Sequence, residues 1–497
     1  MNILPLSKRK SLQTSKEKSY FLSPKDIAFL VIAFSLVALL YFLPTPEGLS
    51  HDGQVMIGIL LMGAVLWITE PIPLPVTGLL IMIIQPLLGV MKAGDVFASF
   101  GNQAVFFLIG AFIIASAIEK HGLHKRIALK FLTYFEDNPR RFTFGIMASC
   151  ACLSFIMPEH GVAALFLPII VSILIAMKIV PKQSNFGKIS MLSVAYGCSI
   201  GSLGTLIGGA RNPLTIGILA EEGYNITFVD WMIYAIPVVL IALPLVWLVL
   251  QFSFPIEIKD ITSAKRAINN QVTKAGPIKR NEFTVLSIFI LTIILWIVFS
   301  SPEYFGLGGI VSPEFYGIGV IALLGSVLLF ITRSVSWSDV EDRVPWGIIL
   351  LYGGAITLGI GMRTTGAGAW IGESLFEMVG SNPYLVILVL IVVTVLLTNV
   401  MSNVGAVAIL LPIGLGIATE IPEINPLLSA MIVALSGGLA FMFVIATPGN
   451  AITYSSGYYS TRDLLKAGGI ANLICIAVIF LVAVFYWMGV LGLGGGS

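Results

Sequence analysis

Long apolar runs follow one another along almost the whole chain, and most have the length that a lipid bilayer requires. A membrane-spanning helix needs about 20 predominantly apolar residues. With only 11% charged residues, the chain also lacks the polar surface of a soluble domain. We therefore predict an all-α polytopic membrane protein, which excludes a soluble enzyme, a nucleic-acid-binding protein and a disordered scaffold. Eleven transmembrane helices are expected, near residues 27–44, 55–69, 76–91, 104–119, 189–220, 231–252, 284–300, 317–332, 345–362, 427–456 and 467–490.

Two further apolar runs, near 142–177 and 382–416, are too long for one plain span and carry polar residues in mid-course. We interpret each as a re-entrant helical hairpin that enters and leaves on the same side of the membrane. This assignment gives the basic residues a strong asymmetry: Lys92 and Arg363 fall on one side, Arg211 falls within a span, and the other lysines and arginines fall on the opposite side. The positive-inside rule places that richer side in the cytoplasm. The N-terminus is then inside, the C-terminus outside, and the protein lies in the cytoplasmic membrane of a prokaryote.

The two hairpins are related in sequence. MPEHGVAALFLPI (157–169) aligns with MSNVGAVAILLPI (401–413), and LIGGARNPLTIG (206–217) resembles VIATPGNAITYSSG (444–457). Upstream, we align 60–69 with 322–332 and expect an extra span near 76–91 in the first half. One hairpin opens inward and its copy opens outward, so the repeats are inverted. Inverted repeats with paired, interrupted helices are the sequence signature of secondary transporters, whose site lies at the middle of the membrane.

Interrupted helices expose backbone N–H groups that attract anions and carbonyl groups that bind cations. In the second hairpin, Ser402 and Asn403 can donate to a carboxylate, while oxygens of Thr398 and Asn403 can face a cation. In the matched span the break is Thr447, Pro448, Gly449 and Asn450. For any one of these residues alone, a hydrogen bond between packed helices would be the better explanation.

These motifs resemble the divalent anion/sodium symporters, a family that carries dicarboxylates, citrate or sulfate, and the resemblance covers nearly the whole chain. It implies a homodimer and an elevator-type transport domain that moves against a scaffold. It also implies hairpin tips that clamp substrate carboxylates, with sodium ions behind them. The corresponding division is a cytoplasmic tail (1–26), scaffold helices with an arm (27–135), transport-domain half one (136–256), a cytoplasmic linker (257–283), a second scaffold part with its arm (284–380) and transport-domain half two (381–492).

The sequence departs from the family pattern at several positions. The family has a Ser-Asn-Thr triplet at each tip, but here Val404 replaces the second Thr, and Pro158, Glu159 and His160 replace the first triplet. At the first helix break, Arg211 follows Gly209 and Ala210, although Asn212 remains. The predicted substrate-binding residues are His160, Gly161, Arg211, Asn212, Ser402, Asn403, Val404, Thr447, Pro448, Gly449 and Asn450, with a residual sodium site at Thr398, Asn403 and Ala446.

Arg211 and Glu159 are the charged residues that fall well inside predicted membrane segments. A buried ionisable group there costs at least about 2.5 kcal/mol, so it is usually paired and functional. Our hypothesis is that the two form an ion pair in place of the family's first sodium ion. Three alternatives stay open: Arg211 contacts the substrate carboxylate directly, Glu159 and His160 relay a proton, or the charge pair only joins the hairpin to its neighbouring helix.

The sequence therefore predicts a secondary transporter of divalent anions rather than an enzyme. The expected substrates are C4 or C5 dicarboxylates such as succinate, malate or 2-oxoglutarate, moved by sodium-independent exchange. Sodium-coupled symport of a dicarboxylate or sulfate is the alternative, and an anion channel is a weaker one because polar groups occur only at the paired breaks. No cofactor and no metal site are expected, apart from Na⁺ at the site of the second repeat. The partners are the anion, the lipid bilayer and a second copy of the chain, with no nucleic acid.

Overall fold

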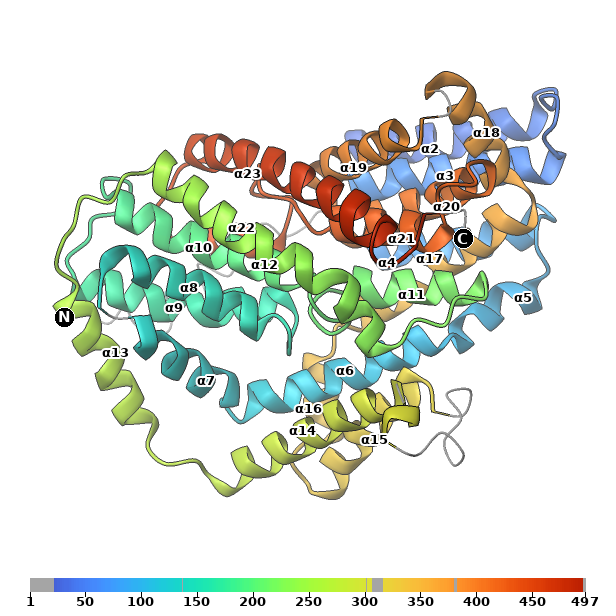
Figure 1. Ribbon diagram of the computed structural model, residues 1–497. Helices are drawn as coiled ribbons and strands as arrows, with labels where there is room; N and C mark the ends of the chain where they lie inside the picture. Colours follow the sequence, from blue (N-terminus) through green and yellow to red (C-terminus); the bar gives the residue numbers. More distant parts are fainter. Residues whose placement is uncertain (1–21, 136, 301, 306–315, 380–381, 495–497) are drawn as a thin grey trace.

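The computed structural model describes residues 22–135, 137–300, 302–305, 316–379 and 382–494, and every regular element in these ranges is helical (Figure 1). Most of the predicted cytoplasmic tail lies outside them. The first half contains α2 (Pro24–Phe42), α3 (His51–Thr69), α4 (Leu74–Leu87), α5 (Ala93–Ala98), α6 (Gln103–Lys120), α7 (Leu123–Leu132), α8 (Pro139–Leu153), α9 (Glu159–Ala176), α10 (Asn185–Gly201), α11 (Arg211–Glu221) and α12 (Phe228–Ser253). After α13 (Thr262–Ala275), the second half contains α14 (Arg280–Ser300), α15 (Ile318–Ile331), α16 (Trp337–Arg343), α17 (Trp346–Thr364), α18 (Ala367–Val379), α19 (Pro383–Val400), α20 (Asn403–Glu420), α21 (Pro426–Ser436), α22 (Pro448–Tyr454) and α23 (Thr461–Leu481).

Ten helical segments in the described part of the chain are long and apolar enough to cross a membrane. Three of them, α9, α19 and α20, are arms of the predicted hairpins, so length and hydropathy alone do not separate hairpin arms from full spans. The predicted spans at 189–220 and 427–456 are each divided, into α10 and α11 and into α21 and α22. The all-helical, multi-span fold is confirmed, while the number of full spans stays a prediction.

The repeat extends further than the matched motifs indicated. Helices α9 and α20 begin at Glu159 and Asn403, and α4 and α15 begin at Leu74 and Ile318, so both pairs are separated by 244 residues (403 − 159 and 318 − 74). Helix α4 is therefore the counterpart of α15, and our alignment of 60–69 with 322–332 was wrong. Among the apolar helices of the described ranges, the one without a counterpart is α2, not the helix near 76–91. That alignment rested on a short match between two apolar segments, whereas the 244-residue offset applies to the whole repeat.

Packing between the repeats supports this correspondence. Helix α6 lies against α15, and its counterpart α17 lies against α4. Gly110 permits the first contact, because a Cβ atom there would lie 2.6 Å from the backbone of Ala322. Gly354 permits the second, because a Cβ atom there would lie 2.4 Å from the Cα atom of Gly78. Small residues allow such close helix contacts in membranes, so each repeat supplies half of the central helix packing.

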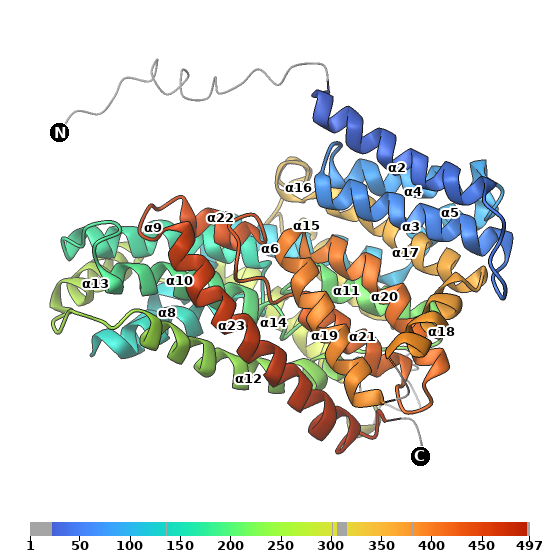
Figure 2. The ribbon, with the colours of Figure 1, turned by 90° about the horizontal axis from the view of Figure 1, so that it is seen from above.

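The remaining helices surround this centre. The hairpin α8–α9 packs on α10, and the hairpin α19–α20 packs on α18 and α21. The long helices α12 and α23 lie side by side along one edge, as Figure 2 shows from above. On the face that carries most of the basic residues, Lys120 of α6 binds Asp339 of α16 at 2.7 Å. The hydrogen bonds from Lys120 and Ser336 hold the pKa of Asp339 well below its usual range. The division into scaffold and transport domain stays a prediction, as does the homodimer.

Candidate functional site

The two hairpin tips and the two helix breaks meet at one cavity of about 640 Å³. Helices α9 and α20 begin at the tips, and α11 and α22 begin at the breaks, so four helix N-termini surround the same space. The N-terminus of a helix favours negative charge because its first N–H groups have no partner within the helix. The cavity is therefore suited to an anion. The lining residues from these segments are Pro158, Glu159, His160, Gly208, Gly209, Ala210, Arg211, Val400, Met401, Ser402, Asn403, Val404, Ile445, Ala446, Thr447, Pro448 and Ala451.

Most of the predicted site residues line this cavity, but some lie behind its wall. The structure brings together Glu159, His160, Arg211, Ser402, Asn403, Val404, Ala446, Thr447 and Pro448. Gly161, Asn212, Thr398, Gly449 and Asn450 are not among the lining residues. Position in a motif therefore indicated the neighbourhood of each residue, but not the direction in which its side chain points.

Asn212 and Asn450 bind the backbone of their own helix breaks. The amide nitrogen of Asn212 donates to the carbonyl groups of Ser202 (2.8 Å) and Thr205 (2.6 Å). The amide nitrogen of Asn450 donates to those of Ala440 (2.9 Å) and Phe443 (3.0 Å), which lie the same number of residues upstream. Carbonyl groups at the end of a helix have no partner within it. Each asparagine thus stabilises a broken helix, and its contact with the substrate stays a prediction.

Arg211 is the one lysine or arginine among the residues that line the cavity, and only 1% of its surface is exposed. Its guanidinium lies between the two breaks. The Nη2 atom donates to the Ser202 hydroxyl at 2.9 Å. A Cβ atom built at Gly209 would lie 2.6 Å from Nη1, and one built at Gly438 would lie 2.3 Å from Nη2. Glycines on both sides therefore create the space that this large side chain occupies.

Our expectation of a direct ion pair between Glu159 and Arg211 was wrong for the described structure. The Ser202 hydroxyl lies between them. It accepts from Arg211, and its one hydrogen lies within reach of both Glu159 Oε2 (3.1 Å) and the carbonyl oxygen of Ser199 (2.7 Å). When that hydrogen points at Glu159, the hydroxyl links the two charges, because it can donate and accept at the same time. Because Ser202 comes from the break between α10 and α11, this chain of hydrogen bonds joins the first hairpin tip to the first helix break.

The second tip has a different, neutral arrangement. The Thr398 hydroxyl lies 2.8 Å from Asn403 Oδ1 and 2.7 Å from the carbonyl oxygen of Gly437. Three oxygens thus gather behind the tip, whereas the predicted third residue, Ala446, is part of the cavity wall. Asn403 Nδ2 is buried and has no hydrogen-bond partner in the described structure. Ser402 and Thr447 accept hydrogen bonds from the backbone N–H groups of Gly405 and Asn450, so each caps the helix that begins beside it.

Helices α3, α4, α6 and α17 and the turn between α3 and α4 close the cavity on the opposite side. They contribute Ile68, Thr69, Glu70, Leu74, Phe112, Ile348 and Leu351. Glu70 is exposed and ends α3 in a left-handed backbone conformation, with φ of 47°. One wall is thus polar and comes from the tips and breaks, while the other is mostly apolar.

Sequence reasoning missed Ser202, Gly438 and the apolar wall. Ser202 could have been noticed because it precedes Asn212 within the interrupted span. The role of Gly438 depends on a contact with Arg211 from the other repeat, for which the sequence carried no local signal.

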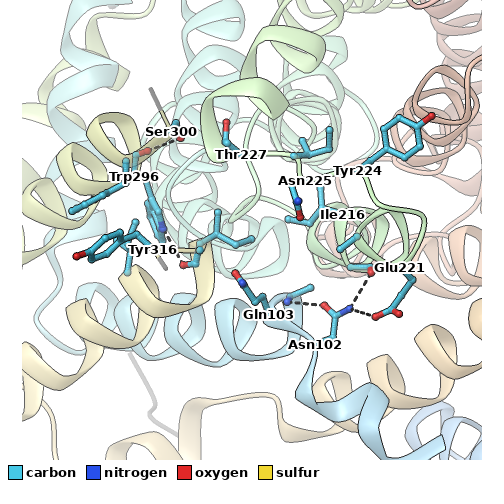
Figure 3. A pocket seen from close by; sticks show the side chains of 18 residues that line it. Asn102, Gln103, Ile216, Glu221, Tyr224, Asn225, Thr227, Trp296, Ser300 and Tyr316 are labelled. Atoms are coloured by element: carbon cyan, nitrogen blue, oxygen red, sulfur yellow. Dashed lines mark hydrogen bonds between the residues drawn. The ribbon is translucent and has the colours of Figure 1, made fainter. Parts of the chain in front are cut away.

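A cavity of about 480 Å³ at the C-terminal end of α11 was also not foreseen (Figure 3). There Asn102 donates to the Gly217 carbonyl (3.0 Å) and to Glu221 (3.1 Å), which connects α6 to α11.

Paired hairpins and paired helix breaks around one central cavity define a class, the membrane transporters built from inverted repeats. The chain belongs to the family described as "Sodium:sulfate symporter transmembrane region", which matches residues 25–493. This membership makes it a transporter and not an enzyme.

Relatives of known name match almost the whole chain. The sodium-dependent dicarboxylate transporter SdcS of Staphylococcus saprophyticus is 31% identical over 96% of this chain and 94% of its own length. SdcS of Staphylococcus aureus strain USA300 is 31% identical over 92% and 90%. Among solved structures, Neisseria gonorrhoeae MtrF aligns with a TM-score of 0.56 at 13% identity, over 95% of this chain and 97% of MtrF. The Alcanivorax borkumensis YdaH transporter aligns with a TM-score of 0.57 at 13% identity, over 94% and 98%. At 13% sequence identity, this structural similarity supports a shared fold and nothing finer.

Proposed function

We propose that this protein exchanges C4 or C5 dicarboxylates across the cell membrane without needing a sodium gradient. The relatives named as dicarboxylate transporters support the substrate class. The observation that carries the exchange proposal is the buried Arg211 guanidinium between the two helix breaks. A covalently attached cation cannot be released on the other side of the membrane. It neutralises an anionic site permanently and therefore leaves that position without an ion to couple.

In this proposal the substrate lies between the hairpin tips. One carboxylate would approach Ser402 and Asn403, whose buried amide nitrogen lacks another partner. The other would approach His160 and Arg211. Glu159 does not repel it strongly, because the Ser202–Arg211 link balances its charge. The bound dianion brings two negative charges that the Glu159–Arg211 pair does not compensate, so the helix N-termini and the hydrogen-bond donors of the tips and breaks would stabilise it, whereas an empty site keeps unsatisfied polar groups. That difference favours exchange over net transport.

The moving part would be an elevator-type transport domain made of both hairpins, α10–α12 and α21–α23. It would slide along the mostly apolar wall formed by α3, α4, α6, α17 and the turn between α3 and α4. The mostly apolar character of that wall supports the proposal, since few polar contacts would have to break. The scaffold would also hold two copies of the chain together as a homodimer.

Proteoliposomes loaded with unlabelled succinate test the coupling. We expect uptake of labelled succinate to need internal dicarboxylate and to proceed equally in sodium, potassium and choline media. Arg211→Ala should be nearly inactive, because it leaves Glu159 buried without a compensating charge. The double variant Glu159→Asn with Arg211→Pro restores the family's neutral pattern, and proline is tolerated at the first position of a helix. We expect this variant to regain uptake that depends on sodium.

Sodium-coupled symport is the second candidate. It is favoured by the three oxygens of Thr398, Asn403 and Gly437, and by the relatives, which are named as sodium-dependent transporters. Steep sodium dependence of the unmodified protein would refute exchange without sodium and select this candidate. Uptake that rises with an inward proton gradient and is lost in Glu159→Gln would instead assign a proton relay to Glu159 and His160.

A further inference from the structure

A second polar pocket lies far from the central cavity, between α7, α13 and the start of α14. Its volume is about 280 Å³, and it lies at the ends of membrane spans on the face that carries most of the basic residues. The lining residues are His121, Gly122, Lys125, Arg126, Gln271, Lys274, Ala275, Lys279 and Glu282. Five of these nine carry a basic side chain and one is acidic, so the pocket has an excess of positive charge.

Arg126 holds together the segments that line this pocket. Its guanidinium binds Glu282 (Nη2 to Oε2, 3.0 Å) and donates to the carbonyl groups of Ala275 (3.0 Å) and Gly276 (2.5 Å). It thereby fixes the turn between α13 and α14 onto α7. These bonds also use the donors of Arg126 and neutralise Glu282, the one carboxylate among the lining residues. The segments around the pocket are therefore held in place before any ligand binds, and the Arg126–Glu282 ion pair needs no further partner.

Besides Arg126, three lysines line the pocket. Lys125, Lys274 and Lys279 line the pocket from three different segments, and their ammonium groups have no partner in the described structure. All three side chains are exposed, so an anion that enters the pocket meets several positive charges at once. The three donors of each ammonium group suit the oxygens of a phosphate group.

The position of the pocket indicates where such an anion comes from. Helix α7 buries Leu123, Leu129 and Leu132 and exposes Lys125 and Lys130. Helix α13 likewise buries Ala264 and Ile268 beneath a polar face. The apolar faces of both helices pack on the protein itself, so their basic and polar faces point outward at the ends of the membrane spans. Basic pockets on the cytoplasmic side bind anionic headgroups.

We propose that this pocket binds a phosphate group, supplied by the headgroup of an anionic phospholipid or by soluble phosphate. The site also contacts the first hairpin, because Gln271 donates to the Ser172 hydroxyl of α9 at 2.9 Å. An occupied pocket therefore stabilises α7, α13 and the base of that hairpin together. The proposal is independent of the substrate and of the coupling ion.

The test compares two triple variants of the full chain. Lys125→Gln, Lys274→Gln and Lys279→Gln remove the pocket charges. The control, Lys178→Gln, Lys182→Gln and Lys259→Gln, removes three exposed lysines of the same predicted face that lie outside the pocket. Binding of phosphatidylglycerol is measured by native mass spectrometry and by thermal unfolding in detergent, with phosphatidylcholine and inorganic phosphate as the other probes.

We expect phosphatidylglycerol to bind the unmodified protein and the control, and to raise their unfolding temperatures. The pocket variant should lose about fivefold in affinity for each lysine removed. If inorganic phosphate binds as well and depends on the same lysines, the site takes soluble phosphate, and the proposed chemistry still holds. If the pocket variant binds both probes as the unmodified protein does, or if the control loses binding equally, the proposal is overturned. The single variant Lys274→Gln provides the same comparison with the smallest change to the fold.

Discussion

The guanidinium of Arg211 occupies the space that a side chain at residue 438 would take. A Cβ atom built at Gly438 would lie 2.3 Å from Arg211 Nη2 and 2.5 Å from its Cζ atom. Arg211 begins the broken helix of the first repeat, whereas Gly438 lies in the break of the second. One residue of the first repeat thus fills part of the helix break in its counterpart.

This contact makes Gly438→Ala a precise probe of Arg211. The added methyl group would force the guanidinium away from Ser202, and we expect exchange to fall at least about tenfold, the effect of about 1.4 kcal/mol. Gly469→Ala is the control, because a Cβ atom there meets nothing within 4 Å. Counterflow of labelled succinate measures the change. Unaltered exchange by Gly438→Ala would show that the position of the guanidinium does not matter.

The asparagines of the two breaks should contribute mainly to stability. Asn212→Ala or Asn450→Ala leaves two carbonyl groups without their donor, which costs about 1–3 kcal/mol for each buried group. We expect lower unfolding temperatures for both variants, of similar size because the two arrangements are equivalent. Asn225→Ala, at an exposed position, is the control. Thermal unfolding of the purified protein measures the effect, and variants as stable as the control would contradict this role.

Asn403 should matter for transport more than for folding. Asn403→Ala removes the buried amide nitrogen that lacks a partner and the oxygen that Thr398 contacts. We expect uptake to be abolished while the protein remains folded. Thr398→Val separates the two effects, because it changes the oxygen cluster and leaves the amide in place. Uptake near that of the unmodified protein in Asn403→Ala would remove the second tip from the site.

The elevator proposal predicts alternating access at Val404, which lines the cavity. In Val404→Cys, a membrane-impermeant thiol reagent should label the cysteine from one side only in a given state. Added dicarboxylate should change the labelling rate, because a ligand shifts the balance between states that bind it differently. Labelling is measured in oriented vesicles after replacement of the exposed native Cys152 by serine. A rate insensitive to substrate would argue against a moving transport domain.

The sequence by itself determined the helical membrane fold, the two hairpins and the inverted repeat. These follow from the length of the apolar runs and from a motif that recurs after 244 residues. Both can be read directly from the sequence. It also placed Glu159, His160, Arg211, Ser402, Asn403 and Thr447 at one site, because broken helices in inverted repeats meet at the middle of the membrane.

The tertiary structure decided which groups touch. Only the folded chain placed Ser202 between Glu159 and Arg211 and turned Asn212 and Asn450 toward their own backbone. Only the helix bounds of the folded chain, supported by the packing of α4 on α17 and of α15 on α6, identified α2 as the apolar helix outside the repeat. These facts depend on distances between segments far apart in the sequence, and on the room that a glycine such as Gly438 leaves for a neighbour. Neither these distances nor the space beside a glycine can be read from the residues that flank it in the sequence.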